Sequence, residues 1–266
     1  MALWDELAGA TVIDLAHTYE RGMPVSPNHP AYQYSMMRRH GDMVRSDGGS
    51  AANEIIVIGG HVGTHIDALG HVSHEGKLHG GVDAASSQTN AGLTSHGIDS
   101  QQPIICRGVL LDIPAVRGVD VLGGGDEVRV ADLEAAEQRA GVTVGKGDAV
   151  LIRTGWAAHW SDVERFRGQV GGAPGPGETA AQWLADREVR VTGAETIAYE
   201  VIRAGQGHAT LPAHRILLVE AGINIMEVLD LTALAASGVS EFLFIASPLK
   251  IKGGTGSPVR PIAVIA

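Results

Sequence analysis

The sequence predicts a layered α/β fold built around a mixed β-sheet. Short apolar runs of the kind that form buried strands recur from one end of the chain to the other. Segments with helical periodicity separate only some of these runs, and the strand-like runs modestly outnumber the helical segments. Partial alternation of this kind favours a layered α/β fold with a mixed sheet. At 266 residues the chain can bury a substantial core, and we expect a single domain over residues 1–266.

Eight segments are predicted to be β-strands. Residues 11–16 form the first, and residues 53–58 form a strand that leads into a cluster of glycines and histidines. Residues 108–113 and 149–153 are continuous apolar runs, which suit buried strands. The other predicted strands are the short apolar runs at residues 189–191, 223–225, 242–246 and 261–265.

Three segments are predicted to be helices, at residues 130–140, 178–187 and 212–221. The first has Asp132 in its first turn and Gly141 just after its end, which are the usual signals for the two ends of a helix. The last carries a proline in its first turn and is followed by a glycine, which is the common placement of these two residues.

Three segments are predicted to be loops. Residues 21–30 are rich in proline and have little conformational freedom, so they form either the wall of a pocket or a surface turn. Residues 40–52 are polar and glycine-rich, and we expect a mobile loop there. Residues 168–177 are rich in glycine and proline and are expected to be a flexible surface insertion.

Composition argues against several classes of function. A net charge of −10 argues against a nucleic-acid partner and against anionic membrane surfaces. No apolar run approaches the length of a membrane span, and residues 1–6 carry acids instead of the basic start of a signal peptide. The single cysteine, Cys106, excludes an intrachain disulfide and is expected to be a small buried residue. We therefore expect a cytoplasmic protein without a nucleic-acid or membrane partner.

The most informative segment is His-Val-Gly-Thr-His-Ile-Asp-Ala-Leu-Gly-His, which runs from His61 to His71. Imidazole nitrogens and carboxylate oxygens are the ligands of catalytic zinc, manganese and iron sites. A structural zinc site would more often use paired cysteines, which this chain lacks. Three ligands without a thiolate leave positions open on the metal, so the segment predicts a catalytic centre. The alternative is a solvated or buried histidine cluster without a metal.

The spacing requires a bend in the chain. On a straight helix His61 and His65 share a face, but Asp67 points away from it. On a straight strand all of them share a face, but His61 and Asp67 lie roughly 20 Å apart. Neither form brings all three to one ion. The glycines around them allow the bend, and we expect the ligands to cluster in a loop or short helix; these glycines are residues 59, 60, 63 and 70.

The pattern His61-x-Gly63-Thr64-His65-x-Asp67, followed by His71, resembles the signature of the metal-dependent cyclase/hydrolase family. That family includes bacterial kynurenine formamidase and isatin hydrolase. Weaker similarity runs over most of the chain. Family members usually have a proline two residues after the aspartate, whereas this chain has Leu69, which indicates a separate branch. The resemblance implies a swivelling β/β/α architecture and assembly as a homodimer or homotetramer.

The resemblance also implies roles for residues near the first three ligands. It makes His71 the acid–base group, and histidine has a pKa suited to proton transfer near neutral pH. His71 as a fourth ligand, or as a support for the ligands, remains an alternative. Thr64 is a candidate catalytic residue that donates to a ligand or to substrate, although its place beside a tight turn is equally compatible with a conformational role.

His214 and Glu227 are a second candidate pair of metal ligands. From the sequence alone the pair is a weak signal, and each residue could be an ordinary surface or core residue. The formamidases have a histidine and a glutamate in the matching element, and these join the aspartate in a second metal site. The resemblance therefore implies that Asp67 bridges two ions, whereas the isatin hydrolases are described with one manganese. We expect one or two divalent ions per protomer, manganese or zinc.

These residues predict a metal-dependent hydrolase that cleaves the C–N bond of a small amide, formamide or cyclic imide. A bound divalent ion lowers the pKa of a coordinated water from 15.7 to about 7 and polarises a carbonyl group. Two alternatives remain. One is a biosynthetic cyclase or dehydratase that uses the same metal site, and the other is a metal-stabilised binding protein without turnover.

Overall fold

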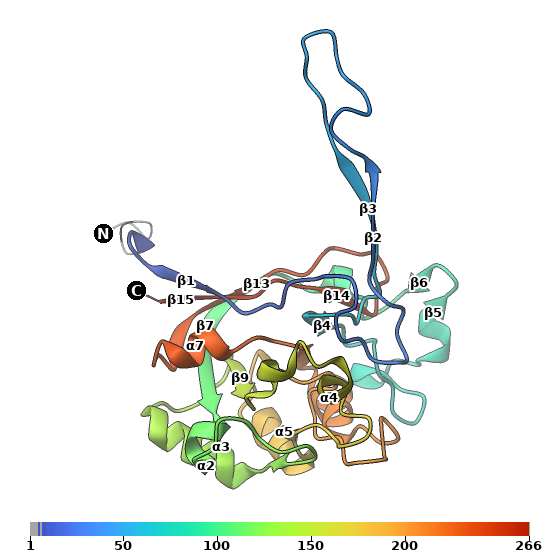
Figure 1. Cartoon of the computed structure of the whole chain (residues 1–266). Coiled ribbons are helices and arrows are strands. Elements are labelled where there is room, and N and C mark those ends of the chain that lie inside the picture. The colour runs from blue at the N-terminus through green and yellow to red at the C-terminus, as the bar shows by residue number, and fades with distance from the viewer. Residues whose placement is uncertain (1–4, 6, 266) are drawn as a thin grey trace.

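The computed structural model describes residue 5 and residues 7–265, and nine strands in this part of the chain form one curled sheet (Figure 1). In the order in which they lie side by side, the strands are β1 (Thr11–Asp14), β15 (Ile262–Ile265), β13 (Glu241–Ala246), β7 (Ile104–Asp112), β9 (Ala149–Arg153), β11 (Val191–Ala194), β12 (Asn224–Glu227), β4 (His65–Asp67) and β14 (Gly256–Pro258).

The sheet is mixed, as the sequence predicts. The four strands β7, β9, β11 and β12 are parallel neighbours in its centre. All other pairs in the sheet are antiparallel, including the pair of β12 with β4 and the pair of β4 with β14. Strand β1 pairs with β15 from Thr11 opposite Ile265 to Asp14 opposite Ile262, so residues distant in the sequence lie side by side at one edge.

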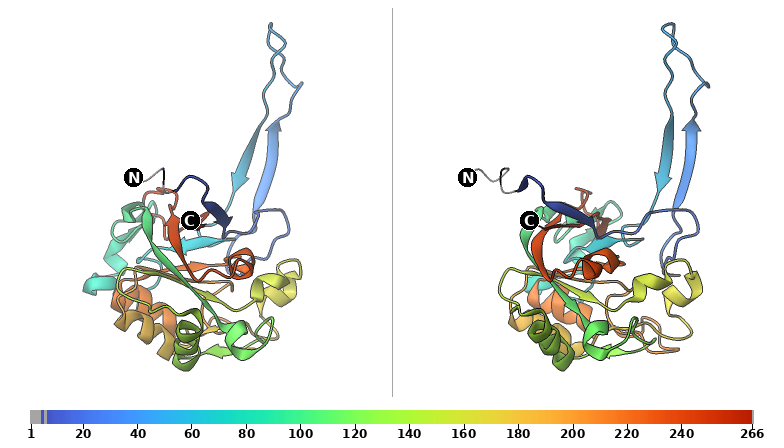
Figure 2. Two further views of the ribbon diagram at one scale, coloured as in Figure 1. Left: turned by 90° about the vertical axis from the view of Figure 1, so that its left-hand side faces the viewer. Right: turned by 60° about the vertical axis from the view of Figure 1, so that its left-hand side comes forward.

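Helices form a layer on one side of the sheet (Figures 1 and 2). The main ones are α3 (Val130–Ala140), α5 (Glu178–Asp186) and α6 (Pro212–His214), which continues directly into the π-helical segment η5 (Arg215–Ala221). Alternating side chains of the central strands fill two cores. Val150 of β9 packs with the helices, whereas Leu151 packs on the opposite face with residues of β13, such as Phe244.

Short elements connect the main ones. The helices among them are α2 (Ile113–Arg117), α4 (Val163–Arg167), α7 (Thr232–Ala236) and the 3₁₀ turns η1 (His79–Gly81), η2 (Ala85–Ser87), η3 (Ile98–Ser100) and η4 (Trp156–His159). Two small ladders pair β8 (Glu127–Val128) with β10 (Gly175–Pro176) and β5 (Gln88–Thr89) with β6 (Gly92–Leu93).

Most predicted elements exist, and several bounds differ. Helix α3 and strand β9 have the predicted bounds. Strand β7 begins four residues earlier than predicted, at Ile104, so Cys106 lies inside it and is half-buried. The strand predicted at residues 189–191 is β11, at Val191–Ala194, and the strand predicted at residues 223–225 extends to Glu227 in β12. Pairing with neighbouring strands determines where each of these strands begins and ends, and the local sequence carries little information about that pairing.

The expected flexible insertion at residues 168–177 is wrong in its second half. Residues 172–177 are buried, and β10 pairs there with β8. The glycines permit close packing of backbone on backbone. A Cβ on Gly175 would lie 2.3 Å from the carbonyl oxygen of Tyr199, and one on Gly172 would lie 2.5 Å from that of Ile202. The glycines that predicted a flexible loop therefore allow this segment to pack closely against neighbouring backbone.

A two-stranded arm projects from the body of the protein (Figures 1 and 2). It consists of β2 (Gln33–Arg38), β3 (Asn53–Val57) and the connecting residues 39–52, which form its tip. Strand β3 is the one predicted at residues 53–58, but it pairs only with β2 and stays outside the main sheet.

No helix in the described part of the chain is both long enough and apolar enough to cross a bilayer.

Candidate metal centre

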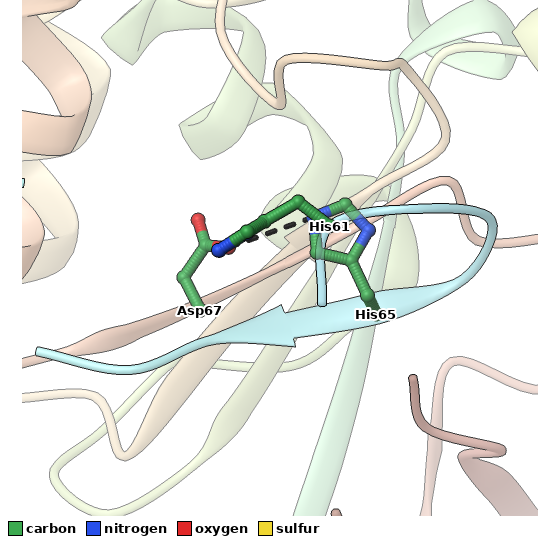
Figure 3. A group of neighbouring side chains, drawn as sticks. All are labelled: His61, His65 and Asp67. Atoms are coloured by element: carbon green, nitrogen blue, oxygen red, sulfur yellow. Dashed lines mark hydrogen bonds and ion pairs between the residues drawn. The ribbon is translucent and has the colours of Figure 1, made fainter. Parts of the chain in front are cut away.

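Two of the predicted ligands lie on a strand. His65 and Asp67 are the ends of β4, and their side chains share one face because side chains alternate along a strand. Ile66 between them points into the core. His61 lies in the loop before β4, and its ring is turned back towards Asp67 (Figure 3). The expectation of a loop or short helix is therefore wrong for His65 and Asp67, since β4 forms ladders with both β12 and β14.

The expected bend is present, and it depends on glycine at two positions. Gly63 has a φ of +65°, and a Cβ there would lie 2.6 Å from the ring of Tyr19. Gly60 packs against β14, where a Cβ would lie 3.0 Å from the carbonyl oxygen of Gly256. A side chain at either position would displace the loop that carries His61.

Within the described residues, the structure forms two groups of side chains that could each hold a metal ion. One is His61, His65 and Asp67, and the other is Asp67, His214 and Glu227. Asp67 Oδ1 lies 2.7 Å from His61 Nδ1 and 3.5 Å from His65 Nε2, while its Oδ2 lies 3.7 Å from His214 Nε2. The five residues expected as ligands from the motif and the resemblance thus come together around one shared carboxylate.

The second group is brought to the first by the sheet. Strand β12 runs antiparallel to β4, and Glu227 lies directly opposite His65 in their register. The Glu227 carboxylate lies 3.4 Å from His65 Nε2 and 3.2 Å from His214 Nε2. His214 is the buried last residue of α6, whose Ala213 belongs to the same core as Ile225 of β12. The strand was predicted to end at residue 225, before Glu227, but β12 extends to Glu227 and ends there.

Each histidine uses its other ring nitrogen to contact the protein. His65 Nδ1 lies 2.7 Å from the carbonyl oxygen of Gly63, and His214 Nδ1 lies 2.7 Å from a carboxylate oxygen of Glu200. His61 Nε2 lies 2.9 Å from the hydroxyl of Thr255. Outer contacts of this kind fix the ring orientation of histidines that ligate metals.

Burial and charge also fit a cation. His65 Nε2 and Asp67 Oδ2 are buried without a hydrogen-bond partner, which is costly unless another group satisfies them. Burial alone would raise the pKa of Asp67, but His71, His61 and His65 hold it well below its usual range. Burial would likewise lower the pKa of His65, yet Asp67 and Glu227 raise it to about 10. The carboxylates thus favour positive charge between them, which a divalent ion supplies.

His71 lies beside the candidate ligands and belongs to neither group. Its ring stacks on His61 with centroids 3.8 Å apart and lies 6.4 Å from the ring of His214. Burial lowers the pKa of His71 to about 4, with His61 and His214 acting in the same direction against Asp67 and Glu227. Its imidazole is therefore neutral at pH 7, and its burial makes it a weaker base than an ordinary histidine.

Thr64 is fully buried and its hydroxyl contacts backbone on two sides. It donates to the carbonyl oxygen of Val228 at 2.5 Å and accepts from the backbone N–H of His17 at 3.0 Å. These contacts tie the loop before β4 to the residue that follows Glu227. Of the two roles foreseen for Thr64, they favour the conformational one.

Several residues near the centre were not predicted from the sequence. His29, in the proline-rich loop, stacks on His61 with centroids 5.4 Å apart, so this loop packs against the centre. Asn224 donates from Nδ2 to the backbone carbonyl of Asp67 at 2.7 Å, and Thr255 and Glu200 contact the candidate ligands His61 and His214. No spacing or motif marks these residues, because only the fold brings them near.

Comparison with known proteins identifies the family. A model of the cyclase family matches residues 13–201. The chain belongs to the cyclase family. Among curated proteins, it is similar to isatin hydrolase of Roseibium aggregatum, with 29% identity over 223 residues, covering 83% of this chain and 77% of that protein. The resemblance drawn from the His61–His71 motif is thereby confirmed.

Solved structures agree on the fold. The crystal structure of a novel cyclase superposes with a TM-score of 0.86 and 30% identity, covering 96% of this chain and 88% of that one. Isatin hydrolase A from Ralstonia solanacearum gives a TM-score of 0.74 at 24% identity, covering 100% of this chain and 98% of that one. The predicted cyclase-like fold is confirmed by these matches.

Electrostatics near the centre predict how stability depends on pH. His17 is buried, its ring stacks on Trp160 with centroids 4.0 Å apart, and burial lowers its pKa below 6.5 against opposing effects of Asp230 and the Leu229 backbone. The unfolded chain therefore binds a proton at higher pH than the folded one. The stability that the neutral ring contributes is present above pH 6.5 and is lost as the pH falls through the folded pKa.

We expect His17→Phe, which keeps the stacking and cannot be protonated, to lose less unfolding free energy than the wild type between about pH 7 and about pH 5. Urea unfolding at several pH values measures this difference. If the unfolding free energy fell equally with pH in the wild type and in His17→Phe, His17 would not be the source of this pH dependence.

Proposed function

We propose that this chain is a metal-dependent hydrolase that cleaves the C–N bond of a small amide, formamide or cyclic imide. The observation that carries the proposal is the convergence of five potential ligands on Asp67, with a neutral histidine, His71, stacked beside them. Similarity to an isatin hydrolase over most of the chain supports the same class of substrate.

In this proposal His61, His65 and Asp67 hold one divalent ion, and Asp67, His214 and Glu227 hold a second. Their nitrogen and oxygen donors suit manganese and zinc equally, so the ion bound depends on availability. A bound ion of this kind lowers the pKa of water and polarises a carbonyl group. The outer contacts to Gly63 and Thr255 keep the rings of His65 and His61 in place while substrate binds.

His71 handles the proton in this proposal. As a neutral imidazole it accepts a proton from the attacking water, and it returns that proton to the leaving nitrogen as the C–N bond breaks. Thr64 acts as a positioning residue, because its hydroxyl joins the loop before β4 to the residue after Glu227.

Metal-stripped protein refilled with manganese or zinc should hydrolyse isatin or N-formylkynurenine, and His71→Ala should lower kcat by about 10²–10⁴-fold with metal content unchanged. Absorbance assays and elemental analysis measure the two quantities. His74→Ala is the matched control, since His74 lies three residues further on and is exposed.

Three outcomes would contradict parts of this account. Unchanged turnover in His71→Ala would remove His71 from proton transfer. Folded, metal-loaded protein that hydrolyses neither these compounds nor other cyclic imides or lactams would favour a cyclase or dehydratase. Protein in which metal removal lowers stability, and which shows no turnover in any condition, would favour a binding protein.

We also propose that residues 1–266 form one domain and that the protein acts in the cytoplasm as a homodimer or homotetramer. Pairing of β1 with β15 supports a single unit, because residues 11–14 and 262–265 are neighbouring strands of one sheet. The single cysteine supports a reducing compartment.

The β2–β3 arm supports the assembly. Its consecutive residues Ile55, Ile56 and Val57 are exposed by 48%, 52% and 48%, so both faces of the strand are open to solvent. Met37 is exposed by 66%. An isolated two-stranded hairpin is only marginally stable in water. Its exposed apolar side chains on both faces favour burial of the arm against another copy of the chain.

The double variant Met37→Asp/Ile56→Asp should therefore dissociate at protein concentrations at which the wild type is assembled. Each buried apolar side chain contributes about 1.5–3 kcal/mol, so the dissociation constant should rise by at least about 100-fold. Light scattering coupled to gel filtration measures the mass. Val170→Asp is the control, since Val170 is 88% exposed but lies on the body. Retained assembly in the double variant would refute a role for the arm.

A further inference from the structure

Glu200 is a buried carboxylate that belongs to neither group of potential metal ligands. It is only 2% exposed, and it accepts three hydrogen bonds from the start of α6. The donors are the backbone N–H of Ala213 at 3.0 Å, the backbone N–H of His214 at 3.1 Å and His214 Nδ1 at 2.7 Å. A buried carboxylate is energetically costly unless hydrogen-bond donors compensate for its lost hydration. For Glu200 these donors all come from Ala213 and His214.

These contacts determine which nitrogen of His214 faces the centre. Because Nδ1 donates to Glu200, Nε2 is left to face Glu227 at 3.2 Å and Asp67 at 3.7 Å. The backbone bonds to Ala213 and His214 fix the turn of α6 from which the ring extends. Glu200 thus controls both the position and the orientation of the ring.

The backbone beside Glu200 is itself held in an unusual conformation. Tyr199 has a φ of +57°, and its buried ring is anchored by a 2.9 Å hydrogen bond between its hydroxyl and Thr192. Val228, which follows Glu227, also has a φ of +57°. A β-branched or bulky residue rarely adopts this conformation, and it persists only where the surroundings enforce it.

One residue connects the two strained positions. The carbonyl oxygen of Thr196 accepts from the N–H of Val228 at 3.2 Å, and its hydroxyl donates to the carbonyl oxygen of Tyr199 at 3.2 Å. Glu200 follows the strained residue Tyr199, and Glu227 precedes the strained residue Val228. Both strained residues are hydrogen-bonded to Thr196. Strain of this kind is typical of functional sites in which one geometry must be kept.

We propose that Glu200 is a positioning residue for His214 and that the Asp67–His214–Glu227 position depends on it for metal affinity. Carboxylates that accept from the outer nitrogen of a ligand histidine raise its basicity and fix its ring, and their loss typically weakens metal binding by 10–100-fold. This inference rests on the proposed function, because it requires that Asp67, His214 and Glu227 hold an ion.

The test is a titration of metal-free protein with Mn²⁺, followed by calorimetry, in four forms of the chain. The wild type should bind two ions and His214→Ala one. Glu200→Gln, which keeps the size of the side chain and removes its charge, should bind one ion as the wild type does and the other about 10–100-fold more weakly. The matched control is Glu195→Gln. Glu195 is equally buried, and its carboxylate accepts from Thr154 and Gly155 without touching a ligand, so this variant should bind both ions normally.

Three results would overturn the inference. Wild-type affinity for both ions in Glu200→Gln would overturn the role of Glu200 and leave the two-ion centre intact. If Glu195→Gln weakened Mn²⁺ binding as much as Glu200→Gln, the lower affinity would follow from a general destabilisation of the fold. A single ion in the wild type, unchanged in His214→Ala, would overturn both the second metal position and this inference. If Glu200→Gln does not fold, Glu200→Asp keeps the charge, withdraws it from His214 by one methylene and should show the same selective loss.

Discussion

The shared carboxylate of Asp67 is the interaction on which the centre depends. It is buried on β4, its two oxygens face different histidines, and Glu227 and Glu200 place two more buried carboxylates nearby. Buried negative charges are strongly unfavourable unless cations or donors compensate for them. The histidines meet part of this requirement and a divalent ion would meet the rest, which explains why so many titratable groups can share one interior.

The fold provides this arrangement by mixing strand directions at the β4 side of the sheet. Because β12 and β4 are antiparallel, the last residue of one, Glu227, lies opposite the first residue of the other, His65. Glycines then allow the loop carrying His61 to pack against β14. The unusual φ angles of Tyr199 and Val228 cost about 1–3 kcal/mol each, and the surrounding hydrogen bonds through Thr64 and Thr196 maintain them.

Much of this centre could be predicted because its chemistry is local. The residues from His61 to Asp67 indicate a candidate ligand set and require a bend, and α3 and β9 follow from periodicity and end signals. The strand character of His65 and Asp67 could not be predicted, since it comes from pairing with β12 and β14. Glu200 could not be predicted either, because its contact with His214 exists only after the chain has folded. The buried glycine-rich segment 172–177 shows that composition alone does not separate flexibility from close packing.

The most direct measurement is a crystal structure of the protein soaked in Mn²⁺, with anomalous differences collected at the manganese edge. The account predicts two peaks, one among His61, His65 and Asp67 and one among Asp67, His214 and Glu227, each within about 2.0–2.3 Å of its ligand atoms. Peaks only at other places, or none in this centre at saturating metal, would contradict the claim that Asp67 organises a metal site.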